Sequence, residues 1–218
     1  MINGSARHRG RLFVIAAPSG AGKTSLVRAL MQREPALRFS ISFTTRKQRP
    51  TEQHGRDYFF VSKDEFQRMV EAGELLEHAQ VFDNYYGTAR RQVEDALAAG
   101  QHLILEIDWQ GAGQIRRALP ECVSIFILPP SRSELERRLR GRGTDSEEAI
   151  QRRLRDASSD MTHWREFDHV VVNDDFERAL GELQEVVAGR GGAAHRDREG
   201  LAELAAGLTE EQGVGDRG

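Results

Sequence analysis

The sequence predicts an α/β protein built on a doubly wound, largely parallel sheet. Short apolar runs that suit buried parallel strands recur along the chain, the first at Leu12–Ala16. Stretches with helical periodicity separate these runs in the second half of the chain. A glycine-bearing loop, residues 17–24, joins the first run to a helical pattern. This order of strand, loop and helix is typical of such folds.

The remaining elements of the sheet follow from the same patterns. Further strands are expected at Phe39–Phe43, Leu103–Ile107, Val123–Leu128 and His169–Val172. Helices are expected at Gly111–Ala118, Ser131–Arg140, Glu147–Ser159 and Phe176–Ala188. Strands that alternate with helices predict right-handed crossovers.

The segment between residues 44 and 100 breaks this alternation. Ser62 and Glu65 have the capping-box spacing, which predicts a helix from Lys63 to about Gly73. Its other expected elements are strands at Asp57–Val61 and Leu75–Val81 and a helix at Ala89–Ala99. The sequence therefore predicts a small mixed subdomain inserted into the sheet.

Length and charge limit the class of protein. A chain of 218 residues suffices for one α/β domain with a substantial core. The net charge of −3 argues against a nucleic-acid-binding protein, which is usually basic. No apolar run approaches transmembrane length, and residues 1–10 are polar, so we expect a flexible N-terminus and no membrane partner.

The cysteine, the histidines and the composition of the C-terminal tail each add an expectation. Cys122 is the single cysteine, which excludes an intramolecular disulfide and a cysteine-based zinc site and makes a cytoplasmic location the default. The seven histidines show no metal-ligand spacing. The tail, residues 189–218, is rich in Gly, Ala and charge; Leu201, Leu204 and Leu208 form one weak helical face, but disorder is predicted.

The loop after the first strand has the features of a phosphate-binding P-loop. Gly20 and Gly22 allow backbone N–H groups to converge on a phosphate, and the helix N-terminus and Lys23 add positive charge. Thr24 is placed to offer its hydroxyl to Mg²⁺. The expected ATP-binding loop is Ala17, Pro18, Ser19, Gly20, Ala21, Gly22, Lys23, Thr24 and Ser25. The alternative is a glycine-rich turn that only caps a helix, with Lys23 solvated; Ala17 also replaces the first glycine of the strict pattern.

Several separated motifs then agree in order and spacing with one family. They are Ser42-Phe-Thr-Thr-Arg-Lys-Gln-Arg-Pro50, Gly55-Arg-Asp-Tyr58, Glu74-Leu-Leu-Glu77, Asn84-Tyr-Tyr-Gly-Thr88 and Glu106-Ile-Asp-Trp-Gln-Gly111. From about Leu12 to Val187 the chain resembles guanylate kinases, which transfer a phosphoryl group from ATP to GMP. The resemblance implies a P-loop nucleoside monophosphate kinase-like core over residues 11–188, with an inserted GMP-binding subdomain (42–91) and a lid (138–155).

The resemblance also implies roles for individual residues. Those that hold the GMP phosphate match Arg46, Arg49, Tyr58 and Tyr86, and those around the guanine match Ser42, Glu77, Thr88 and Asp108. Lid arginines that close over the ATP phosphates match Arg138, Arg142 and Arg153, and Asn173 matches a position near the adenine. With Lys23 and Arg46, the lid arginines form the expected catalytic set. Glu106 stands where many relatives have aspartate, and it is expected to contact Mg²⁺ through water, together with Thr24.

Base chemistry agrees with this assignment. Guanine presents donors at N1 and N2 beside the acceptor O6, so a carboxylate such as Glu77 accepts and a hydroxyl such as Ser42 or Thr88 donates. Adenine would leave polar groups unpaired, at about 1–3 kcal/mol each. The resemblance therefore implies ATP-dependent, in-line phosphorylation of GMP, and of dGMP, within purine nucleotide metabolism, and the base chemistry is consistent with the choice of guanine.

Two alternative functions remain at this point. The first is a guanylate-kinase-like interaction module without catalysis, and the second is a kinase for another monophosphate. In addition, Tyr58 and Tyr86 are read either as ligand contacts or as core aromatics, and the arginine-rich helices as a lid or as solvated faces. The retained Lys23 favours an enzyme, and Glu77 favours guanine. The oligomeric state stays open, a homo-oligomer included.

Overall fold

A computed structural model describes residues 9–81, 83–141 and 146–209. The described residues form two compact units. The first contains the chain up to Ile15 and from Met31 to Ser124, and the second contains Ala16–Leu30 and the chain from Ile125 onward.

The main sheet is parallel and has the strand order β2-β7-β1-β8-β9. Its strands are β1 (Leu12–Ala16), β2 (Leu37–Phe39), β7 (His102–Glu106), β8 (Val123–Leu128) and β9 (His169–Val172). The first strand of the chain stands in the interior, so the later strands extend the sheet on both sides of it, as in doubly wound folds. The predicted α/β fold class is confirmed.

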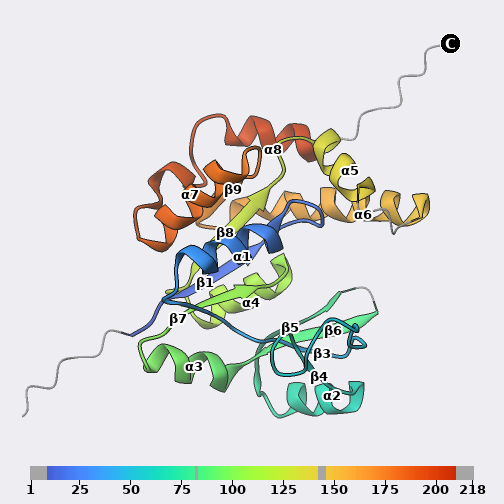
Figure 1. Cartoon of the computed structure of the whole chain (residues 1–218), viewed down its shortest axis with the longest axis vertical. Coiled ribbons are helices and arrows are strands. Elements are labelled where there is room, and N and C mark those ends of the chain that lie inside the picture. Colours follow the sequence, from blue (N-terminus) through green and yellow to red (C-terminus); the bar gives the residue numbers. More distant parts are fainter. Residues whose placement is uncertain (1–8, 82, 142–145, 210–218) are drawn as a thin grey trace, which may run out of the picture. The chain divides into compact units, whose positions relative to one another are not determined.

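In the first unit, β7 pairs with β1 and β2 (Figure 1). All five residues of β1 are buried, which explains their continuous apolar run. Helices α3 (Arg90–Ala98) and α4 (Trp109–Ala118) belong to this unit, whereas α1 (Lys23–Arg33) begins in the second unit. Helix α3 packs against β7 through a face that includes the buried Val93 and Leu97.

The first unit also contains a mixed sheet of strand order β4-β3-β6-β5 (Figure 1). Its elements are β3 (Phe43–Thr44), β4 (Phe59–Phe60), β5 (Leu75–Val81), β6 (Asn84–Ala89) and the helix α2 (Lys63–Glu71). The Ser62 hydroxyl accepts from the Glu65 N–H at 3.1 Å, which is the predicted N-cap of α2. Strand β5 has the predicted bounds and lies at an edge of the sheet.

Two sequence predictions in this region are wrong. Phe39–Phe43 is not one strand, because Phe39 ends β2 in the parallel sheet and Phe43 begins β3 in the mixed sheet, where it pairs with Phe59 and Gly87. Strand β6 was not predicted as a strand, although its motif was recognised. Its pairing with two strands outweighs the weak strand propensity of Asn84 and Gly87.

The second unit contains β8 and β9, which pair in parallel, and most of the C-terminal helices. The helical elements are α5 (Arg132–Arg140), α6 (Glu147–Met161), η1 (Thr162–Glu166), α7 (Phe176–Val187), η2 (Gly191–Ala194) and α8 (Leu201–Thr209). Phe126 and Phe167 are fully buried, with ring centroids 4.9 Å apart, in the core of this unit. Serine side chains cap α5 and α6, and Asp175 caps α7.

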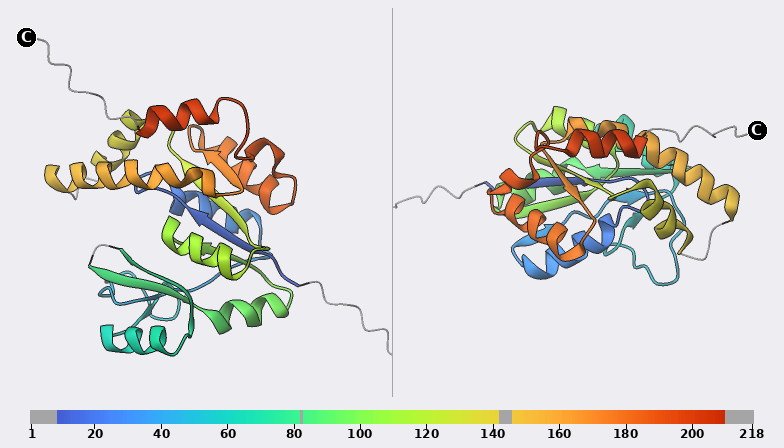
Figure 2. Two further views of the ribbon diagram at one scale, coloured as in Figure 1. Left: turned by 180° about the vertical axis from the view of Figure 1, so that it is seen from behind. Right: turned by 90° about the horizontal axis from the view of Figure 1, so that it is seen from above.

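The predicted disordered tail is corrected over residues 191–209. Leu201, Ala205 and Leu208 are buried on one face of α8, which lies beside α6 (Figure 2). Arg198 forms an ion pair with Glu182 of α7 at 3.2 Å. The apolar face of α8 is stabilised by this packing, which a composition rich in Gly and Ala does not reveal. Residues 1–8 and 210–218 lie outside the described residues.

No helix in the described ranges is long and apolar enough to cross a membrane.

Candidate active site

The glycine-rich loop follows β1 and enters α1 within the second unit. Gly20 and Gly22 have φ values of 92° and 95°, in the region that favours glycine. A Cβ on Gly22 would lie 2.3 Å from Asn173 Nδ2, so a side chain at this position would also collide with its neighbour. Gly22 therefore allows the loop to lie closely against Asn173, the residue that follows β9.

The carbonyl of Ala21 joins the loop to two of the predicted site residues. It accepts from Asn173 Nδ2 at 2.7 Å and from Arg138 Nη1 at 3.3 Å. Arg138 Nη2 also donates to the Asn173 carbonyl at 2.9 Å. The structure thus brings Arg138 and Asn173, which are 35 positions apart, together on the loop.

Glu134 orients Arg138 from the preceding turn of α5. Its Oε1 accepts from Arg138 Nε at 2.7 Å, and Arg137 and Arg138 together lower the pKa of the Glu134 carboxyl to about 2. The (i, i+4) spacing of Glu134 and Arg138 on a predicted helix is the sequence signal that indicates this ion pair.

The first turn of α1 contains the other loop residues. Lys23 is half-buried, whereas Thr24 and Ser25 are exposed. No acidic residue stands in this first turn, so the positive end of the helix dipole is not offset there. Arg153 is half-buried in α6. Arg142, the remaining predicted lid arginine, lies outside the described residues.

A second set of predicted site residues meets in the first unit, centred on Glu77 in β5. The Glu77 side chain is 3% exposed, and Thr88, its cross-strand partner in β6, is fully buried. The Thr88 hydroxyl donates to Glu77 Oε1 at 2.6 Å. In this structure the Thr88 hydroxyl therefore donates its hydrogen bond to the Glu77 carboxylate. The sequence had suggested Thr88 as a donor to the oxygen of the base.

Burial dominates the electrostatics of Glu77. Desolvation raises the pKa of the Glu77 carboxyl to about 7, the hydrogen bond from Thr88 opposes this rise, and the nearby Asp108 carboxylate adds to it. A carboxyl with this pKa changes charge near neutral pH, which makes its ionisation sensitive to a bound ligand.

Helix α4 closes the other side of this carboxyl. Asp108 is its N-cap, and Asp108 Oδ1 accepts from the Gly111 N–H at 2.8 Å. A Cβ on Gly111 would lie 2.5 Å from Glu77 Oε2 and 3.3 Å from Asp108 Oδ1. The absence of a side chain at Gly111 is therefore what lets Glu77 and Asp108 lie together at the start of the helix.

Arg46 is held by an acidic residue that the sequence reading missed. Its Nη1 and Nη2 donate to Glu52 Oε2 and Oε1 at 3.1 and 2.8 Å. This pairing raises the pKa of Arg46 and lowers that of Glu52. Glu52 Oε2 also accepts from the Arg49 backbone N–H at 2.9 Å, so Glu52 links the two predicted phosphate-binding arginines.

Two tyrosines lie with Arg46. The Tyr58 and Tyr86 rings are 6.1 Å apart, edge to face, and the Arg46 guanidinium is 5.4 Å from the centre of the Tyr58 ring. Burial raises the pKa of the Tyr58 phenol, and the Glu106 carboxylate adds to this rise. Both tyrosines are half-buried, as is Ser42, whose carbonyl accepts from the Phe59 N–H at 2.9 Å.

The predicted magnesium residues fit a metal that arrives on a nucleotide. Among the residues that the structure describes, no group of three or more His, Cys, Asp or Glu side chains is placed to hold a metal ion. Mg²⁺ bound to phosphates needs only one or two protein oxygens, because phosphates and waters supply the rest. The exposed Thr24 hydroxyl and the half-buried Glu106 carboxylate are suitable donors of this kind.

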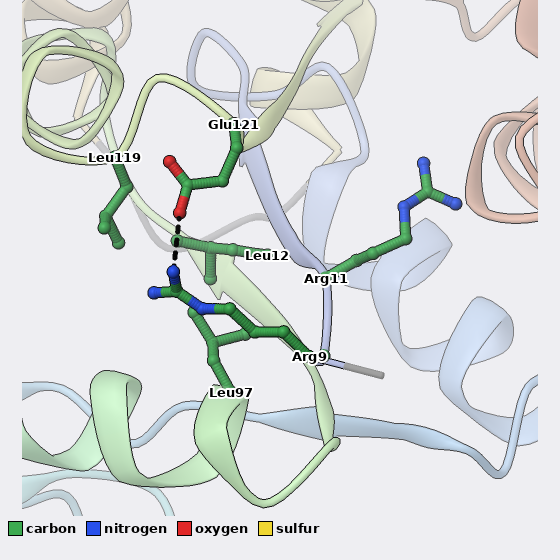
Figure 3. A pocket seen from close by; sticks show the side chains of 7 residues that line it. Arg9, Arg11, Leu12, Leu97, Leu119 and Glu121 are labelled. Carbon is green, nitrogen blue, oxygen red and sulfur yellow. Dashed lines mark ion pairs between the residues drawn. The ribbon is translucent and has the colours of Figure 1, made fainter. Parts of the chain in front are cut away.

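A small cavity of about 190 Å³ in the first unit belongs to neither set (Figure 3). Leu12, Leu97 and Leu119 line it, and the ion pair between Arg9 and Glu121 crosses it. Leu12 is the first residue of β1, whereas the glycine-rich loop follows the last one. The cavity therefore lies at the amino end of β1, and none of its lining residues is a predicted site residue.

The sequence model of guanylate kinases matches residues 9–190 of the chain. The chain belongs to the guanylate kinase family. A guanylate kinase of Chromohalobacter salexigens is 57% identical over 80% of this chain and 81% of its own length. The guanylate kinase of Methylococcus capsulatus is 54% identical over 92% of this chain and 98% of its own length. That of Escherichia coli K12 is 52% identical over 82% of this chain and 87% of its own length.

The fold agrees with a solved member of the guanylate kinase family. The crystal structure of guanylate kinase from Anaplasma phagocytophilum superposes with a TM-score of 0.70 at 32% identity, covering 94% of this chain and 98% of the other. The family assignment therefore rests on both sequence and fold.

Proposed function

We propose that this chain phosphorylates GMP with ATP to give GDP, the activity of the guanylate kinase family. In this proposal, the set of residues around Glu77 and Arg46 binds GMP, and the set around the glycine-rich loop binds ATP. The observation that carries this proposal is the buried Glu77 carboxyl, which is 3% exposed and hydrogen-bonded to Thr88. A buried carboxyl with Asp108 beside it is a costly arrangement unless a ligand with suitable donors completes it.

Guanine supplies those donors. Its N1–H and N2–H₂ groups match an ionised Glu77, and Ser42 is the hydroxyl left to donate to O6 because Thr88 donates to Glu77. Adenine presents an acceptor at N1 and would face the carboxylate with a lone pair. A site that leaves buried polar groups unpaired with the wrong base discriminates strongly between bases. Because these residues contact the base and not the sugar, the proposal also predicts that dGMP is accepted.

The monophosphate is proposed to bind at the cluster of Arg46, Arg49, Tyr58 and Tyr86. Glu52 fixes the Arg46 fork and the Arg49 backbone, and the raised pKa of Tyr58 keeps its phenol able to donate. Arginine suits this role because its planar fork binds two phosphate oxygens.

ATP is proposed to bind at the glycine-rich loop, residues 17–25. The loop N–H groups and Lys23 face the phosphates, and Arg138, Arg142 and Arg153, in the proposed lid of residues 138–155, neutralise charge as the phosphoryl group moves. Asn173, whose amide donates to the Ala21 carbonyl of this loop, is proposed to lie near the adenine. The reaction needs positioning and charge neutralisation, so we infer direct in-line transfer without a covalent enzyme intermediate.

Magnesium accompanies the nucleotide in this proposal. Thr24 and, through water, Glu106 would hold the ion, which would neutralise charge on the phosphates of ATP. Because its substrates are nucleotides of purine metabolism, we propose a cytoplasmic enzyme.

A substrate panel tests the proposal. The protein is incubated with MgATP and GMP, dGMP, AMP, CMP or UMP in turn, and ADP release is measured. Turnover confined to GMP and dGMP is expected. Equal turnover of AMP would contradict the role of Glu77, and no turnover with any monophosphate would favour a binding module.

A further inference from the structure

Strand β5 places Glu77 at an edge of the mixed sheet, where half of the backbone groups find no partner strand. His78, the next residue, has an exposed side chain and pairs in register with Gly87 of β6. The N–H and C=O groups of His78, next to the recognition carboxyl, therefore point away from β6, toward the edge of the sheet where no further strand pairs with β5.

The Gln114 side chain replaces that missing strand. Gln114 Oε1 accepts from the His78 backbone N–H at 3.1 Å, and Gln114 Nε2 donates to the His78 carbonyl at 2.7 Å. One side-chain amide thus makes the same pair of hydrogen bonds that one residue of an adjacent antiparallel strand would exchange with His78.

Gln114 stands in the helix that also touches the Glu77 side chain. Asp108 caps α4, Gly111 leaves space for Glu77 Oε2, and Gln114 follows one turn later on the same face. Helix α4 therefore contacts β5 at both the carboxyl of Glu77 and the backbone of the next residue, and the two elements pack together.

We propose that Gln114 is a positioning residue for base recognition: by fixing the His78 backbone, it holds the Glu77 carboxyl in register with Thr88 and Asp108. This inference rests on the proposed function, because it assigns to Gln114 an effect that acts only through Glu77. It predicts that loss of the amide disturbs guanine selection while leaving the binding of ATP unchanged.

The test compares three single variants. Gln114→Met keeps the side-chain length but removes both hydrogen bonds. Arg117→Met is the matched control, because Arg117 is an exposed residue of the same helix. Glu77→Gln is the benchmark for loss of the carboxylate. For each protein, KM for GMP, KM for ATP, kcat, the melting temperature and the ratio of kcat/KM for GMP over IMP are measured; IMP lacks the amino group at C2.

We expect Gln114→Met to raise KM for GMP at least fivefold, to lower the GMP-to-IMP ratio toward that of Glu77→Gln, and to change KM for ATP less than twofold. Arg117→Met should behave as wild type. In the double variant, Gln114→Met should add nothing to the selectivity lost in Glu77→Gln, whereas an independent structural effect would add. If Gln114→Met is unfolded, Gln114→Asn, which keeps an amide but shortens its reach to the His78 backbone, takes its place with changes in the same direction expected.

Wild-type KM and selectivity in Gln114→Met, or equal rises in KM for GMP and ATP, would overturn the inference while the base site at Glu77 stands. If Glu77→Gln itself left the GMP-to-IMP ratio unchanged, the proposed base site would fail first. The two failures are therefore distinguishable in one set of measurements.

Discussion

Thr88 donates its hydroxyl proton to Glu77 across the β5–β6 pair at 2.6 Å, and both side chains are buried. The bond is the favourable contact that opposes the cost of burying this carboxyl, since it lowers the pKa that desolvation raises. The ionisation of Glu77 therefore depends on the Thr88 hydroxyl, a group of the protein itself, as well as on any bound substrate.

Removal of the Thr88 hydroxyl is expected to weaken GMP use selectively. Thr88→Val keeps the side-chain shape but leaves Glu77 Oε1 without its donor, so the carboxyl ionises less readily. At neutral pH we expect KM for GMP to rise about tenfold, which corresponds to about 1.4 kcal/mol, with KM for ATP unchanged. Thr88→Ser, which keeps the hydroxyl, should stay close to wild type in the same steady-state assay; a similar loss in both variants would contradict the role of this bond.

The pKa of about 7 for Glu77 predicts a pH dependence of GMP use. The ionised form accepts from guanine, so KM for GMP should rise as the pH falls through 7, by about tenfold between pH 8 and pH 6. The GMP phosphate also titrates in this range. Glu77→Gln serves as the control, because its remaining pH dependence reports the phosphate alone, and identical slopes for wild type and variant would argue against titration of Glu77.

The same group predicts a pH-dependent stability without ligands. The pKa of Glu77 is raised from 4.5 to about 7 on folding, so between these values the folded state binds more protons than the unfolded state. Its contribution to the free energy of unfolding is therefore lost as the pH rises from about 4.5 to 7, by about 3 kcal/mol. Urea unfolding at pH 5 and pH 8 should show that Glu77→Gln gains stability relative to wild type at the higher pH. A constant difference between the two proteins at both pH values would contradict this.

Two glycines of α4 provide a matched pair of substitutions. A Cβ on Gly111 would lie 2.5 Å from Glu77 Oε2, whereas one on Gly113 would meet Arg117 Nη1 at an ordinary 3.6 Å. Gly111→Ala should therefore raise KM for GMP tenfold or more and lower the free energy of unfolding by about 1–3 kcal/mol. Gly113→Ala should keep wild-type kinetics, with stability unchanged or increased by up to about 1 kcal/mol. Equal effects of the two variants in unfolding and kinetic measurements would show that the Glu77 contact is not the cause.

Local patterns predicted the elements that depend on local physics. The glycines at 20 and 22 adopt the positive φ values expected of a phosphate loop, and the Ser62 cap starts α2. The strand bounds of β1, β5, β8 and β9 also agree with the apolar runs. These features depend on residues that are adjacent in the sequence.

Features that depend on partners distant in the chain were missed. Strand β6 is held by β3 and β5, and α8 is held by α6, so neither is visible from its own composition. Glu52 and Gln114 act on Arg46 and His78 through side-chain geometry that no pattern encodes. The roles of the matched residues came from the family resemblance rather than from spacing.

The central claim is that Glu77 selects guanine at a site separate from the loop that binds ATP. Calorimetric titration of wild type and Glu77→Gln, with GMP and with MgATP in separate experiments, tests it most directly. The account predicts that the variant binds GMP at least tenfold more weakly and MgATP with wild-type affinity. Equal losses for both nucleotides, or unchanged GMP affinity, would contradict it.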